Sequence, residues 1–67
     1  MYYLTFKEVN PGQIFQFSEQ LFIKLREPYV KILGRMYNSI RVGFNQGYLV
    51  DFKDDDRCLL RKDIDLM

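Results

Sequence analysis

The chain has 67 residues, an apolar share of 48% and a formal net charge of +1. A chain of this length can bury only one core, and its apolar and aromatic content excludes intrinsic disorder, so residues 1–67 are expected to form a single small domain. The near-neutral charge gives no overall attraction to nucleic acid or membranes, and no apolar run reaches the roughly 20 residues of a membrane-spanning helix.

The N-terminal part of the chain predicts a short strand followed by a turn. Residues 2–6 alternate apolar side chains with the more polar positions between them, as a strand with one buried face does. Pro11 and Gly12 then predict a turn, because proline fixes φ and glycine adopts the left-handed conformation that the turn requires.

The next two runs predict a hairpin. Residues 13–17 and 21–26 alternate apolar and polar side chains and are separated by the polar residues 18–20, which is the pattern of two strands joined by a turn. On the second strand, the side chains expected to face the core are Leu21, Ile23 and Leu25. Those expected to face outward are Phe22, Lys24 and Arg26.

Residues 27–38 follow neither a helical nor a strand period, and they contain Pro28 and Gly34. The β-branched residues within 30–33 favour a strand, while a long loop is the alternative reading, and the sequence leaves both open. Loops of this length are uncommon in small domains and often carry function.

A second hairpin is predicted over residues 39–52. Its strands are joined by residues 45–47, whose Asn and Gly tolerate positive φ. The side chains expected on its buried face are Ile40, Val42, Phe44, Tyr48, Val50 and Phe52. Residues 53–57 are too charged for a sheet interior and predict an exposed turn, after which residues 58–61 predict a final strand or a turn of helix.

Three segments carry turn and core residues typical of one group of small β proteins. They are residues 6–15 with their Pro-Gly turn, the strand of residues 21–25, and residues 47–52 with Asp54 and Asp55 behind them. Together they resemble small SH3-like barrels, including short bacterial and phage proteins. The resemblance implies an all-β fold, a small SH3-like barrel of about five short antiparallel strands, and it carries no active site.

The residues that most enzymes rely on are scarce. The chain has no His and a single Cys, so no His-assisted nucleophile or His metal ligand exists, and Cys58 is expected to be a small core residue. Asp54, Asp55 and Asp56 lack the spacing of a calcium loop and are expected to be solvated. We expect no enzymatic activity, no catalytic residues, no cofactor and no metal site.

The single Cys also bears on the cellular compartment. A secreted domain this short normally depends on several disulfides, and the N-terminal residues lack a basic region followed by an apolar run, so no signal peptide is expected. A cytoplasmic protein without a membrane partner is predicted.

Exposed aromatic and basic side chains are the remaining candidates for function. Residues 1–50 hold six Lys and Arg against three Glu, while residues 51–67 hold four against six Asp. Tyr, Phe, Met and Arg are enriched at protein interfaces. The predicted partner-binding residues are Phe22, Lys24, Arg26, Tyr29, Arg35, Tyr37 and Arg41.

Protein binding is the preferred function from sequence. The chain is predicted to be a protein–protein interaction module, an accessory or regulatory subunit or a phage-type modulator of a host protein. Exposed strand edges would also suit pairing with a second copy. The alternative is an RNA or single-stranded nucleic-acid binder, in which bases stack on aromatic side chains beside a basic track.

Overall fold

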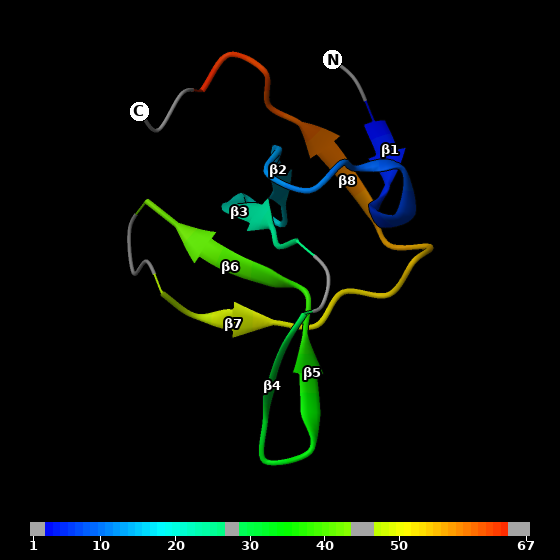
Figure 1. The fold of residues 1–67 in the computed structure, drawn as a ribbon. Coiled ribbons are helices and arrows are strands. Elements are labelled where there is room, and N and C mark those ends of the chain that lie inside the picture. The colour runs from blue at the N-terminus through cyan, green and yellow to red at the C-terminus, as the bar shows by residue number, and fades with distance from the viewer. Residues whose placement is uncertain (1–2, 27–28, 44–46, 65–67) are drawn as a thin grey trace.

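A computed structural model describes residues 3–26, 29–43 and 47–64 (Figure 1). These residues form eight strands and one turn of 3-10 helix, which confirms the all-β prediction. The strands are β1 (Tyr3–Thr5), β2 (Ile14–Phe17), β3 (Gln20–Lys24), β4 (Val30–Ile32), β5 (Arg35–Tyr37), β6 (Ser39–Val42), β7 (Leu49–Val50) and β8 (Arg57–Leu60). The 3-10 turn is η1 (Phe6–Glu8). No helix within the described ranges is long and apolar enough to cross a membrane.

Six of the strands form one antiparallel sheet in the order β1-β8-β2-β3-β6-β7. The first and last strands of the chain are neighbours, because β8 lies between β1 and β2. Among the described residues β1 and β7 have a pairing partner on one side only, so the sheet does not close. The structure therefore confirms short antiparallel strands but not the expected closed SH3-like barrel.

Both predicted hairpins are present. The β2–β3 hairpin turns at Ser18 and Glu19, which have φ of 52° and 66°, the two positive values of a type I′ turn. The β6–β7 hairpin pairs Ser39 with Val50, whereas Phe44 and the turn residues 45 and 46 lie outside the described residues. The predicted N-terminal strand is shorter than expected, since residue 6 already belongs to η1.

An aromatic cluster fills the space that the sheet encloses. Phe52 lies at its centre, with ring centroids 5.0–5.5 Å from those of four other phenylalanines. Those four are Phe6, Phe15, Phe17 and Phe22. Val9 and Cys58 complete the buried cluster. Offset and edge-to-face ring pairs of this kind add stabilisation beyond the area that they bury.

The predicted orientation of β3 is wrong. Phe22 and Lys24 are only 4% and 8% exposed, while Leu21 and Ile23 are half-buried on the opposite face. Alternation separates the two faces of a strand without saying which one is inward. Here the face that carries Phe22 is the inner one, because the Phe22 ring stacks on that of Phe15, with the ring centroids 5.8 Å apart.

Lys24 can be buried because backbone carbonyls take the place of water. Its Nζ donates to the carbonyl oxygens of Phe6 at 3.0 Å and of Val9 at 2.7 Å, and it lies 4.4 Å from the centre of the Phe6 ring. Hydrogen bonds from a charged donor are stronger than neutral ones. The Lys24 side chain thus ties β3 to η1 and the residues that follow it.

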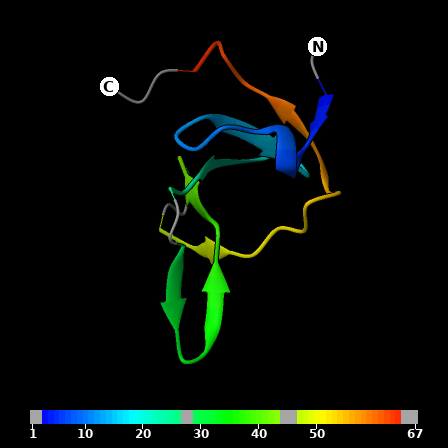
Figure 2. The same ribbon diagram turned by 45° about the vertical axis from the view of Figure 1, so that its right-hand side comes forward.

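The segment that the sequence left open is a second hairpin. β4 and β5 pair with each other in a separate two-stranded sheet. The strand prediction is therefore confirmed for residues 30–32, residue 33 belongs to the turn, and the long-loop alternative is wrong. Figures 1 and 2 show this hairpin projecting away from the six-stranded sheet, at the opposite end of the molecule from β1 and β8. We refer to residues 30–37 as the arm.

Replacing Lys24 by Met is expected to lower the free energy of unfolding by about 3 kcal/mol. The substitution keeps an apolar stem but leaves the carbonyls of Phe6 and Val9 without their charged donor. Urea unfolding followed by circular dichroism measures the change. Lys62→Met, at an exposed lysine, is the matched control and should shift stability by less than about 0.5 kcal/mol. Equal midpoints for both variants would contradict this role of Lys24.

Candidate binding surface

The arm exposes apolar side chains on both of its faces. Leu33 at its tip is 99% exposed, and three further apolar side chains are between 41% and 46% exposed. These three are Val30, Ile32 and Met36. Because these side chains remain exposed, they contribute little burial free energy to the fold. An isolated two-stranded hairpin is at best marginally stable in water.

The cations of the arm lie among its apolar residues. Lys31 is directly opposite Met36, and Arg35 is directly opposite Ile32, so each face of the ribbon carries one positive charge beside apolar groups. Residues 28–50 contain Lys31, Arg35 and Arg41 and no Asp or Glu. The arm and the β6–β7 hairpin are therefore a basic region of an otherwise near-neutral chain.

The tip of the arm is a two-residue turn with an unusual sequence. Leu33 and Gly34 have φ of 51° and 81°, again the values of a type I′ turn, for which Asn-Gly is preferred. A leucine in this conformation costs roughly 1 kcal/mol. The chain thus holds a fully exposed leucine at a position where its backbone is strained.

Asn38 fixes the base of the arm to the core. Its side-chain oxygen accepts the Phe52 N–H at 2.9 Å, and its amide donates to the Phe52 carbonyl at 2.8 Å. Its backbone bonds to Val50 and to Leu25. Because Asn38 is buried and directly follows β5, the arm leaves the sheet from a rigid point.

A hollow of about 410 Å³ lies between the arm and β7. Ile32 and Tyr37 line it from the arm, and Gly47, Tyr48 and Leu49 line it from the β7 side. Tyr48 is 66% exposed, which is high for an aromatic ring next to a core. The hollow extends the apolar surface of the arm onto the edge of the six-stranded sheet.

An aromatic groove of about 430 Å³ lies on the other side of Tyr48. Its apolar lining consists of Phe17, Phe22, Tyr48, Val50 and Phe52. Arg41 contributes the one charged side chain among the described lining residues. No ion pair or side-chain hydrogen bond joins the Arg41 guanidinium to any residue of the described ranges.

The seven predicted binding residues fall into different places. Arg35 and Tyr37 belong to the arm, and Tyr29 lies half-buried immediately before β4. Phe22 and Arg41 meet in the aromatic groove. Arg26 is exposed beyond the end of β3, and Lys24 belongs to the core.

Three surface residues were missed by sequence reasoning: Ile32, Leu33 and Tyr48. Leu33-Gly34 stands between two short runs rich in β-branched and aromatic residues, and a Gly at that place can signal a two-residue hairpin turn. Tyr48 was expected on a buried face, yet it is largely exposed. Tyr48 lies immediately before the edge strand β7, at the rim of the sheet.

Cys58 is a core residue, as its sequence context predicted. It is 2% exposed, and its thiol donates to the Leu4 carbonyl oxygen at 3.6 Å. Burial raises the pKa of the Cys58 thiol, with a further contribution from the negative charge of Asp56. Both effects disfavour the thiolate, which is the nucleophilic form.

The acidic turn is solvated, in agreement with the sequence. Lys53 donates its backbone N–H to the carboxylate of Asp56 at 2.9 Å, while Asp54 and Asp55 are exposed. Within the described part of the chain, no group of three or more His, Cys, Asp or Glu is arranged to hold a metal ion.

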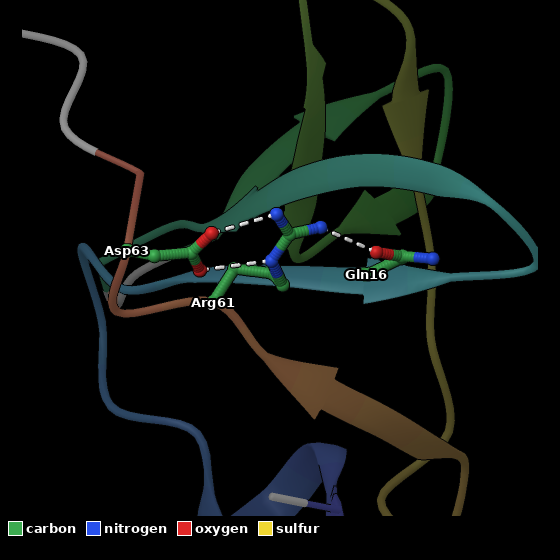
Figure 3. Close-up of polar contacts among 3 residues, drawn as sticks. All are labelled: Gln16, Arg61 and Asp63. Carbon is green, nitrogen blue, oxygen red and sulfur yellow. Dashed lines mark hydrogen bonds and ion pairs between the residues drawn. The ribbon is translucent and has the colours of Figure 1, made fainter. Parts of the chain in front are cut away.

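Arg61 fastens the segment after β8 to the sheet (Figure 3). Its guanidinium donates to both carboxylate oxygens of Asp63, at 2.9 and 2.8 Å, and to the side-chain oxygen of Gln16 on β2 at 2.6 Å. Paired bonds of this kind fix geometry as well as charge. This side chain stabilises the end of the domain remote from the arm.

No family model matches the sequence, and neither a similar curated protein nor a similar solved structure is found. The arm, the hollow and the aromatic groove are therefore the basis on which a function has to be inferred.

The pKa of Asp63 is expected to be about 2 instead of the ordinary 3.8, chiefly because its carboxylate accepts hydrogen bonds from Arg61. A lowered pKa means that this pair stabilises the fold fully above pH 3.8 and that the contribution is lost as pH falls through about 2. Carboxyl-detected NMR titration measures the pKa directly. In Arg61→Gln the Asp63 pKa should return toward 3.8, and identical titrations of the two proteins would rule out the pair.

Proposed function

We propose that this chain is a non-enzymatic protein-binding module, an accessory or regulatory subunit acting in the cytoplasm, and that it binds its partner through the arm and the adjoining hollow. Kinship with the SH3-like small barrels remains part of this proposal. It is supported by short antiparallel strands arranged around one aromatic cluster.

The tip of the arm is the observation that carries the proposal. Leu33 is 99% exposed and has a φ of 51°, so it gains no burial energy and adds backbone strain. Strain of this kind tends to persist where it serves a function. Burial of this leucine by a partner would more than offset the backbone strain, since a buried leucine side chain gains about 2 kcal/mol over an exposed one.

The chemistry of the arm favours a protein over a nucleic acid. Its exposed apolar side chains Val30, Ile32, Leu33 and Met36 carry no ring on which a base could stack. The largely exposed ring of the proposed surface is that of Tyr48, in the adjoining hollow. Each of its two cations stands next to an apolar residue, as in a protein interface, where apolar anchors are framed by polar groups. Binding of RNA or single-stranded nucleic acid is the alternative.

Replacing Leu33 by Asn is expected to separate binding from folding. Asparagine suits a positive φ, so the variant should be more stable by about 0.5 kcal/mol while losing the apolar anchor. We expect recovery of the protein partner from native lysate, after nuclease treatment, to fall about tenfold, as the loss of about 1.4 kcal/mol would give. Quantitative mass spectrometry measures the recovery and thermal unfolding the stability.

Glu19→Asn is the matched control, because it makes the same kind of change at another exposed turn residue, with φ of 66°, outside the arm. It should retain the partner. Unchanged recovery by Leu33→Asn would remove the arm from the interface. Recovery that disappears on nuclease treatment of the unaltered protein would favour the nucleic-acid alternative.

A further inference from the structure

We propose that the edge of β7 binds an extended, acidic and apolar segment of the partner protein as an added β-strand. The inference rests on the proposed protein-binding function and specifies how part of the partner is held. It is independent of the anchor role of Leu33, because it depends on the backbone of β7.

The backbone of β7 offers a free pairing position. Over the described residues β7 pairs with β6 and with no other strand. The Tyr48 carbonyl accepts the Arg41 N–H at 2.7 Å. Because bonding groups alternate along an antiparallel pair, the N–H and C=O of Leu49 point away from β6. They are the groups to which an added strand would bond.

The edge strand β7 is two residues long, but it lacks the charged side chains and the proline that often prevent such pairing. Natural edge strands often carry charged side chains or proline, whereas residues 48–50 are Tyr, Leu and Val. On a sheet edge this apolar composition favours the addition of another strand.

The two hollows beside β7 provide places for the side chains of an added strand. Successive side chains of a strand point to opposite faces. On one face of β7 lies the aromatic groove with Val50, and beside Leu49 lies the hollow shared with the arm. Both are shallow, open depressions with mainly apolar linings, against which large apolar side chains of an added strand would pack.

The positive charges near β7 favour an acidic segment as the added strand. Arg41 in the groove has no ion-pair partner among the described residues, and Arg35 lies on the same face of the arm as Ile32, which lines the hollow. Residues 28–50 contain no carboxylate, and that of Asp51, directly after β7, accepts a hydrogen bond from the Asn38 amide at 3.2 Å. An Asp or Glu on the added strand would therefore supply the partner for Arg41. A second copy of the chain at this edge would instead bring its own Lys31, Arg35 and Arg41 and no carboxylate from residues 28–50.

A random-peptide display library, selected against the immobilised full chain, tests this inference. We expect the enriched peptides to combine large apolar residues with Asp or Glu and to contain no proline between them. A synthetic peptide of the enriched sequence should shift the amide NMR signals of Leu49 and Val50. No enrichment, or enriched peptides without acidic residues, would overturn the proposal.

Variants at two positions then separate backbone pairing from side-chain contact. Leu49→Pro removes the outward N–H, whereas Leu49→Ala shortens the side chain and keeps that donor, so proline should weaken peptide binding about tenfold more than alanine. Arg41→Gln keeps the backbone intact and should weaken acidic peptides while sparing their Gln and Asn analogues. Peptide binding that is equal across Leu49→Pro, Leu49→Ala and Arg41→Gln would refute strand addition.

Recovery of the full partner distinguishes the two proposals. Loss of the partner with Leu33→Asn but not with Arg41→Gln or Leu49→Pro would keep the arm as the interface and reject the added strand. Retention of the partner by all three variants would reject both the arm as the interface and the added strand. If the chain is a dimer in sedimentation and Leu49→Pro makes it monomeric, a second copy is the occupant of the edge and the proposal fails.

Discussion

The contact between the Asn38 amide and the Phe52 backbone is the constraint on which the rest of the structure depends. Asn38 bonds to both the N–H and the C=O of Phe52, as a neighbouring strand would, and so holds a stretch that lies beyond the end of β7. The Phe52 ring is thereby placed among four other rings. Since Asn38 also directly follows β5, one buried side chain positions both the centre of the core and the base of the projecting arm.

Turn chemistry predicted most of the fold. Gly12 has the expected positive φ of 88°, and the two hairpins of the six-stranded sheet were placed correctly. Strand pairing between distant segments was not predictable, because β1 meets β8 through contacts that leave no local pattern. The open sheet, with β7 as an edge, follows from that long-range order.

The candidate surface was predicted in part. Arg35, Tyr37 and Arg41 were chosen because basic and aromatic residue types are common at protein interfaces. In the structure Arg35 and Tyr37 belong to the arm, and Arg41 lines the aromatic groove. Phe22 and Lys24 were assigned to the surface because alternation alone cannot tell the inner face from the outer one. Lys24 lies inside because two carbonyl oxygens of a distant segment accept hydrogen bonds from its ammonium group, which no local pattern reveals.

The adjacency of β1 and β8 has a consequence for synthesis on the ribosome. Tyr3 pairs with Leu59 and Leu4 with Cys58, so the sheet needs residues from both ends of the chain. The hairpins are local and can form early, whereas contacts between such distant residues form late because loop closure must precede them. The phenylalanines of the nascent chain therefore stay incompletely covered until residue 60 has left the exit tunnel, so the six-stranded sheet is completed later than its local hairpins.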